Sequence, residues 1–171
     1  MNIATAPHQD VDQTADGTTL NPYYAVVRSK ILGAFRGLSE HEDGPALSLM
    51  ADDVQYTFDG DHALGGTRVS RAGVKKWFGR LFRLLPGRFV VRSVEVTGWP
   101  WRTRAGTTLE HEVTPPVGAA YWATAVQTAE LRWGVAVRIR THVDDMAKLV
   151  HTLDALAERG NAEAKAPPIV E

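Results

Sequence analysis

Apolar residues along this chain recur first at helical spacing. One stripe, at intervals of three and four positions, consists of Tyr24, Val27, Ile31, Phe35 and Leu38. It follows Asn21-Pro22, an N-cap and a first-turn proline, so a helix is predicted to begin there. Ser70 precedes a second stripe, which Pro86-Gly87 ends: Val74, Trp77, Phe78, Leu81 and Leu85. The chain is therefore predicted to contain two long amphipathic helices in its first half.

The second half of the chain changes to the alternating spacing of strands. Strands are predicted at 54–58 between the two helices and then at 88–98, 107–114, 119–132 and 135–143. Trp133-Gly134 is predicted to be a tight hairpin turn. A short helix at 46–50 and a last helix capped by Asp144 or Asp145 complete the pattern. Early helices and a late run of antiparallel strands predict an α+β fold, with a curved sheet wrapped over the helices.

Composition narrows the functional classes. The 171 residues include 44% hydrophobic and 23% charged residues, as in an ordinary globular domain. The absence of cysteine excludes disulfides, thiolate catalysis and cysteine-ligated zinc. A net charge of −1 gives no general attraction to nucleic acid or to an anionic membrane. With no secretory signal and no apolar run long enough to span a bilayer, a cytoplasmic location is expected.

The two ends of the sequence differ in composition from its middle. Residues 1–20 are polar, with several aspartates and no Lys or Arg, and are predicted to form a flexible N-terminal tail. Residues 159–171 are rich in Ala, Glu and Pro and are predicted to form a C-terminal tail, with packing back onto the body as the alternative. A single domain is then expected over residues 21–158.

Two segments together resemble a known family. ADDVQYTFDGDHALGGTRVSRAGVKKWFGRL (51–81) and LRWGVAVRIRTHVDDMAKL (131–149) resemble the nuclear transport factor 2-like superfamily, in particular its SnoaL-like branch. The resemblance covers most of residues 23–156. It implies a cone-shaped mixed or antiparallel sheet wrapped around three to four helices and enclosing an apolar pocket. The superfamily includes isomerases, cyclases, dehydratases, epoxide hydrolases and proteins that only bind, so the fold alone does not define an activity.

The resemblance implies that Tyr56 and Phe58 face the pocket. A catalytic Asp of ketosteroid isomerase falls at Phe58. In limonene epoxide hydrolase a water-binding Tyr falls at Tyr56, an Asn at Phe58, an Arg and Asp pair near Glu112 and Thr114, and a second Asp at Thr141. Neither catalytic set is complete in this chain, so neither activity is carried over.

Candidate chemistry therefore comes from the residues themselves. Glu110 and Glu112 are two positions apart on a predicted strand and share one face, on which two close carboxylates would form an acid–base pair. The alternative is an outward face in water, with Leu109 and Val113 turned to the core. Tyr56 is predicted to orient a water or to donate a hydrogen bond to an oxyanion, or else to be a core aromatic.

Further residues are predicted to shape the site. Hydrogen bonds are expected from Thr114, Gln127 and Thr141, cavity walls from Phe58, Trp77 and Trp99, and a cover over the pocket mouth from His62. The loop that holds Asp59, Asp61 and His62 has spacing that a metal tolerates, but such loops are usually turns. We expect neither metal nor cofactor.

One segment has a marked charge asymmetry. Its positive side chains have no acidic residue between them: Arg68, Arg71, Lys75, Lys76, Arg80, Arg83, Arg88 and Arg92. They favour either an acidic partner, such as a carrier protein, or a solvated surface that acids elsewhere in the chain balance. Nucleic acid is not expected, because no recognition motif accompanies the segment.

These observations predict a cofactor-free small-molecule enzyme that uses general acid–base chemistry in an apolar pocket, of isomerase, cyclase, dehydratase or epoxide-hydrolase type. A small apolar or polycyclic substrate and a homodimer packed through the outer face of the sheet are expected. The alternative is a binding or interaction module on the same fold. Pocket polarity distinguishes the two: glutamates in solvent and a pocket of apolar groups plus Tyr56 would favour binding.

Overall fold

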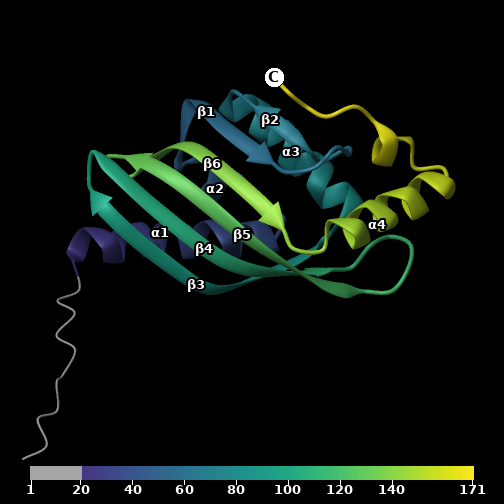
Figure 1. The fold of residues 1–171 in the computed structure, drawn as a ribbon, viewed down its shortest axis with the longest axis horizontal. Helices are drawn as coiled ribbons and strands as arrows, with labels where there is room; N and C mark the ends of the chain where they lie inside the picture. Colours follow the sequence, from purple (N-terminus) through teal and green to yellow (C-terminus); the bar gives the residue numbers. More distant parts are fainter. Residues whose placement is uncertain (1–20) are drawn as a thin grey trace, which may run out of the picture.

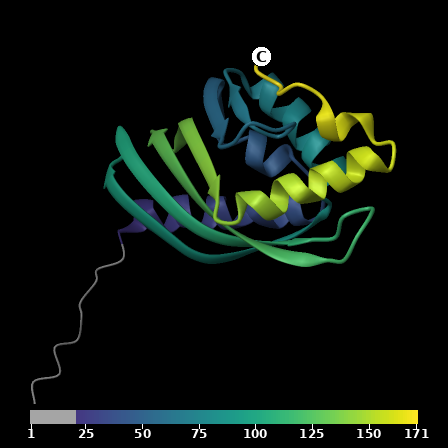
Figure 2. The same ribbon diagram turned by 45° about the vertical axis from the view of Figure 1, so that its right-hand side comes forward.

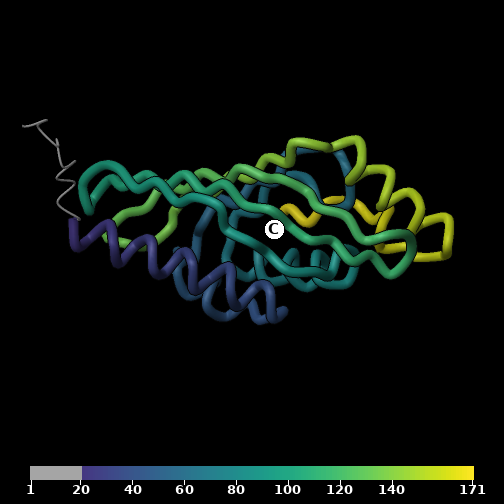
Figure 3. Tube along the Cα trace, turned by 90° about the horizontal axis from the view of Figure 1, so that it is seen from below, coloured from purple at the N-terminus to yellow at the C-terminus, as the bar shows by residue number. Residues whose placement is uncertain are grey.

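The structure, a computed structural model, describes residues 21–171; the predicted N-terminal tail, 1–20, lies outside the described residues. Six strands form one mixed sheet in the order β2-β1-β6-β5-β4-β3. The long strands curve, and helices α1 to α3 lie on one side of them (Figures 1–3). The predicted α+β architecture, a curved sheet over helices, is confirmed.

The helices begin where the sequence predicts caps. Asn21 accepts a hydrogen bond from Tyr23 N at the start of α1 (Pro22–Ser39), and Ser70 accepts one from Gly73 N at the start of α3 (Arg71–Leu84). Asp145, rather than Asp144, caps α4 (Met146–Glu158) through Lys148 N. The short α2 (Gly44–Leu47) ends before Met50, because residues 50–53 already belong to the first strand.

Of the five predicted strands, the first three are longer than the alternation predicts, the fourth is shorter by two residues, and the last has the predicted bounds. The observed strands are β1 (Met50–Phe58), β2 (Gly66–Arg68), β3 (Gly87–Trp99), β4 (Arg102–Val113), β5 (Tyr121–Arg132) and β6 (Val135–Val143). The sequence did not predict β2, which is three residues long and pairs antiparallel with β1. The β5–β6 turn has positive φ at both Trp133 and Gly134, as a tight hairpin requires.

Side chains of β4 show how the sheet divides inside from outside. Thr103, Ala105, Thr107, Leu109, His111 and Val113 are buried under the helices. The alternate positions, among them Glu110 and Glu112, lie on the opposite, outer face. The concave face of β4, β5 and β6 is therefore the floor of the core, and α1 and α3 are its cover.

Residues 159–171 pack back onto the body, which was the alternative to a loose tail. A short 3-10 helix, η1 (Ala162–Lys165), buries Ala164, and Glu163 forms a salt bridge with Arg83 of α3 at 2.6 Å. Arg80 also donates to the carbonyl oxygen of Pro167. In Figure 1 this segment, in yellow, lies beside α3 and α4.

Ala164→Asp tests this packing. Ala164 is 2% exposed, so a carboxylate there would be desolvated without a partner and should lower the free energy of unfolding by about 2 kcal/mol or more. Ala162→Asp, in the same turn but exposed, is the matched control. Urea unfolding measures both; equal midpoints for the two variants would contradict the packing.

Candidate functional site

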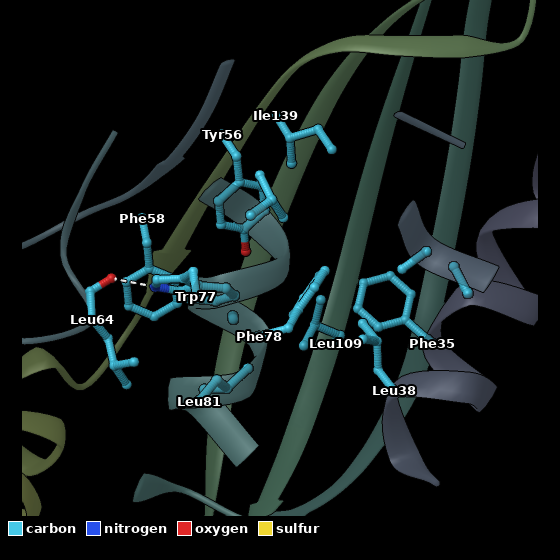
Figure 4. Packing of buried hydrophobic residues seen from close by; sticks show 14 of the residues in the cluster. Phe35, Leu38, Tyr56, Phe58, Leu64, Trp77, Phe78, Leu81, Leu109 and Ile139 are labelled. Atoms are coloured by element: carbon cyan, nitrogen blue, oxygen red, sulfur yellow. Dashed lines mark hydrogen bonds between the residues drawn. The ribbon is translucent and has the colours of Figure 1, made fainter. Parts of the chain in front are cut away.

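An apolar cavity lies between the helices and the concave face of the sheet. It has a volume of about 60 Å³, and a neighbouring cavity of about 60 Å³ shares Phe35, Leu38, Tyr56 and Gln127 with it. We call the first of these the inner cavity. Trp77 and Leu81 of α3 and Leu149 of α4 also line it. Figure 4 shows aromatic and aliphatic side chains meeting here from α1, α3 and the sheet.

A row of residues crosses the concave face at one depth. Thr107 of β4 is opposite Gln127 of β5, Gln127 is opposite Thr141 of β6, and Thr141 is opposite Phe58 of β1. Gln127 Nε2 donates to Thr141 Oγ1 at 3.0 Å, and Thr141 Oγ1 lies 3.2 Å from the hydroxyl of Tyr56. Three polar side chains thus form one connected group at the wall of the inner cavity.

The hydroxyl of Tyr56 has a proton to give. Burial raises the pKa of Tyr56 to about 12, so the phenol stays protonated at neutral pH. Thr141 accepts from Gln127 and has one proton of its own; where that proton goes to Tyr56, the proton of Tyr56 is free for a ligand. The Tyr56 ring packs on Trp77 with 4.9 Å between centroids, which fixes its direction.

His111 is the titratable base of the inner cavity. It is 8% exposed, lines the cavity and stacks on Phe89 with 4.2 Å between ring centroids. Its Nε2 is buried and has no hydrogen-bond partner among residues 21–171. Burial lowers the pKa of His111 to about 4, so the imidazole is neutral and can accept a proton at neutral pH.

Apolar side chains separate the two polar ends of the cavity. Leu109, Ala125 and Val143 form the next row of the sheet, and His111 opposite Ala123 forms the row beyond it. Thr107 and His111 are four positions apart along β4, which is about 13 Å of strand. Ala123 and Ala125 of β5 have small side chains, so they occupy little of the cavity between its polar ends.

Glu110 and Glu112 do not lie in the inner cavity, so the prediction that they share the pocket face is wrong. Their side chains are 28% and 32% exposed on the outer face and form salt bridges with Arg92 and Arg88, respectively. The hydrogen bond from Arg92 is the main cause that lowers the pKa of Glu110, which makes that group a poorer base. The alternative interpretation, with Leu109 and Val113 turned to the core, is correct.

Three other predicted site residues lie away from the inner cavity. Trp99 is 67% exposed at the far hairpin, where it stacks on Trp101. Thr114 is exposed just beyond β4, and its backbone N donates to the Pro86 carbonyl oxygen at 2.7 Å. His62 holds a turn, because one ring nitrogen accepts from Leu64 N and the other lies 3.1 Å from the Asp59 carbonyl oxygen.

The loop rich in aspartate shows no metal site. Asp59 is engaged by Arg140 at 2.9 Å and by His142 at 3.1 Å, both on the outer face of β6. Within residues 21–171 no group of three or more His, Asp or Glu side chains is placed to hold a metal ion. No helix in the same range is long and apolar enough to cross a membrane.

Most of the positive charges at 68–92 are balanced within the chain. Arg68 is buried rather than on the surface. Among the described residues, salt bridges pair six of the other seven, all but Lys75, as follows: Arg71 with Asp52, Lys76 with Glu171, Arg80 and Arg83 with Glu163, Arg88 with Glu112, and Arg92 with Glu110. This arrangement agrees with the interpretation of residues 68–92 as a solvated surface, whose positive charge is offset by acidic residues elsewhere in the chain.

Known structures share this fold. TerC, crystallised with polyporic acid, is 27% identical over 72% of this chain and 95% of its own, with a TM-score of 0.58. A Jannaschia protein assigned as a SnoaL-like polyketide cyclase is 18% identical over 74% of this chain and 90% of its own, with a TM-score of 0.58. A ketosteroid isomerase-like protein from Erwinia carotovora is 14% identical over 72% and 98%, with a TM-score of 0.61.

These likenesses confirm the nuclear transport factor 2-like resemblance at the level of the fold. No protein-family model matches the chain, and no curated protein matches it in sequence. The activity has to be argued from the site itself.

The sequence identified one end of the inner cavity and missed the other. Tyr56, Phe58, Trp77, Gln127 and Thr141 line the cavity, as the prediction placed them; what they do there stays a prediction. His111 was missed as a site residue, although strand phase already set it opposite Glu110 and Glu112. Its position beside Leu109 and Val113 in the apolar phase of β4 was the available signal.

The pH dependence of stability tests the state of His111. Its folded pKa of about 4 lies below the ordinary 6.5, so the unfolded chain binds a proton first as pH falls. Stability from this group is present above pH 6.5 and is lost toward pH 4, by about 3 kcal/mol in all. Urea unfolding at pH 7.5 and pH 4.5 should show a smaller loss for His111→Phe than for the wild type. Equal losses would contradict a neutral buried His111.

Glu110→Gln and Glu112→Gln test the outer-face placement. Each removes one exposed salt bridge, so each should leave the urea midpoint nearly unchanged and the affinity for a ligand of the inner cavity unaltered. Calorimetric titration measures the affinity, with Gln127→Leu as a variant that alters the cavity. A tenfold loss of affinity in either glutamate variant would mean that the carboxylates take part in ligand binding.

Proposed function

We propose that this protein is a cofactor-free enzyme that moves protons on a small carbonyl compound held in the inner cavity, in an isomerisation or cyclisation. The observation that carries the proposal is the pairing of an unpartnered neutral imidazole, His111, with a protonated phenol, Tyr56, in one apolar cavity. Enolisation requires a base that reaches the α-carbon and a hydrogen-bond donor that reaches the carbonyl oxygen of the same ligand.

Enolisation would move one proton and one electron pair within the inner cavity. The unprotonated nitrogen of His111 takes a proton from the carbon next to the carbonyl, and the electron pair of that C–H bond moves to the carbonyl oxygen. Tyr56 donates a hydrogen bond to the resulting enolate, with Thr141 and Gln127 holding the phenol in place. Return of the proton from His111 to a different carbon gives an isomer. A base of pKa about 4 is weak, so the donors must supply much of the stabilisation.

This arrangement favours enolisation over the other reaction types that the fold admits. Opening an epoxide needs a water activated by a strong base or a charged pair, and no carboxylate lines the inner cavity among the described residues. The solved relatives named as a cyclase and as isomerase-like agree with this choice, and the binding of polyporic acid by TerC supports a cyclic organic ligand.

The size of the cavity limits the substrate. A volume of about 60 Å³ is well below the 300 Å³ or more of typical small-molecule sites. A two-ring substrate therefore requires side chains such as Phe35 and Phe89 to move apart, and a larger polycyclic one would require a wider opening.

A non-catalytic binding protein is the second candidate. Two observations favour it: both glutamates lie outside the cavity, and the lining is mostly apolar. His111, a polar residue of the cavity besides Tyr56, distinguishes the two candidates. A binder needs no neutral base with an unpartnered nitrogen.

Two kinds of partner are also proposed: a second copy of this chain and an acidic carrier protein. An open groove of about 430 Å³ on the outer face carries Glu95 and Glu130 together with Arg104 and Arg138, a mixture of charges that suits a second copy related by a two-fold axis. An acidic carrier protein is less well supported, since internal salt bridges already engage most of the positive residues at 68–92.

Exchange of α-protons tests the catalytic proposal. The wild type should accelerate deuterium uptake by 2-tetralone in D₂O, followed by proton NMR. His111→Gln should lower that rate on the order of a hundredfold or more, because it removes the base. Tyr56→Phe should cost roughly a hundredfold by removing a donor to the enolate. Glu112→Gln, which touches only the outer face, is the control.

Two results decide against the proposal. Undiminished exchange in His111→Gln would remove His111 from the mechanism. Tight binding of polyporic acid by a wild type that exchanges no protons would favour the binding protein.

A further inference from the structure

Arg68 lies behind the wall of the inner cavity and is fully buried. Its guanidinium donates to the carbonyl oxygens of Leu64 at 3.2 Å and of Gly65 at 2.9 Å, and it also bonds that of Gly66. Its Nε has no hydrogen-bond partner among residues 21–171. A buried guanidinium held mainly by carbonyl oxygens keeps its whole charge, because neutral groups solvate it without neutralising it.

No salt bridge within the described residues compensates this charge, in contrast to its neighbours Arg71, Arg80 and Arg83. The titratable groups that face Arg68 are Tyr56 of β1, Arg80 of α3 and His62 of the preceding loop. None of these is negative at neutral pH. Burial lowers the pKa of Arg68 to about 10, which still leaves it charged.

Two aromatic rings separate this charge from the cavity. The guanidinium carbon lies 5.3 Å from the centroid of the Trp77 ring and 5.6 Å from that of Tyr56. Both rings line the inner cavity, and Arg68 does not. Figure 4 shows Tyr56 and Trp77 side by side at this wall, with Trp77 hydrogen-bonded to Leu64, which also accepts from Arg68.

We propose that the charge of Arg68 offsets part of the desolvation cost that the inner cavity imposes on the anions of enols and phenols, and so favours the binding of these acidic ligands. The inference rests on the proposed function, in which the reacting oxygen becomes an enolate beside Tyr56. A unit charge about 10 Å away, at the effective dielectric constant of about 20 that suits protein interiors, favours an anion over its neutral form by roughly tenfold. Arg68 is a positioning residue here, because it acts through Tyr56 and Trp77.

Two matched compounds test the effect of the charge. 4-Nitrophenol ionises near neutral pH with a visible colour change, whereas 4-nitroanisole has the same ring and no ionisable group. Burial raises the pKa of a phenol, as it does for Tyr56, so the effect of Arg68 is the difference between two proteins. In absorbance titrations between pH 5.5 and pH 9, bound 4-nitrophenol should ionise about one pH unit lower in the wild type than in Arg68→Met. His111 stays neutral through this range, so it does not produce the difference. Ionisation of bound 4-nitrophenol at the same pH in both proteins would overturn the inference.

Two variants then assign the effect to the charge. Arg68→Lys should keep the preference for the anion, and Arg68→Met should reduce it about tenfold, while the affinity for 4-nitroanisole stays the same in all three proteins. A parallel loss of both affinities in Arg68→Met would mean that Arg68 only supports the loop, and would overturn the inference. If Arg68→Met does not fold, Arg68→Gln, which keeps hydrogen-bond donors and has no charge, replaces it in the same comparison.

The same experiment separates this inference from the proposed function. Binding of both compounds, with 4-nitrophenol ionising at the same pH in the wild type and in Arg68→Met, ends the inference and leaves the cavity as the site. Failure of either compound to bind the wild type would overturn the site, and the inference with it.

Discussion

The alternation of side chains along β4 decides which groups enter the interior of this protein. A strand turns successive residues to opposite faces, so Leu109, His111 and Val113 are covered by helices while Glu110 and Glu112 lie in the outer layer with Arg92 and Arg88. A shift of one residue would bury two carboxylates and expose the apolar positions, at a cost of several kcal/mol. The register therefore determines both the stability of the core and the chemistry of its cavity.

The inner cavity combines few polar groups with a large aromatic wall. Tyr56, Thr141 and Gln127 satisfy one another, which allows them to be buried, whereas His111 keeps an unpartnered nitrogen and is tolerated because it stays neutral. Behind the wall, Arg68 is the opposite case, a buried charge that neighbouring carbonyls solvate. These two costly features lie on either side of the same rings, and together they define where a negative charge would be stabilised.

Much of the fold could be predicted from periodicity and caps. Asn21, Ser70 and Asp145 cap the helices, and 135–143 is a strand with the predicted bounds. Strand β2 could not be predicted, because three residues with glycine carry no alternation. At the site, phase correctly paired Glu110 with Glu112, but it does not say which face is inside. Leu109 and Val113, which share a face of β4 with His111, indicate that this face is the inner one. The prediction instead placed the two glutamates on the inner face.

The central claim is that chemistry or binding takes place on the concave face, between Tyr56 and His111. A crystal structure of the protein with 2-tetralone tests it most directly. The account predicts the ketone in the inner cavity, with its carbonyl oxygen within about 3 Å of the Tyr56 hydroxyl and the α-carbon beside that carbonyl facing the imidazole of His111. A ketone bound on the outer face beside Glu110 and Glu112, with the inner cavity still closed, would contradict it.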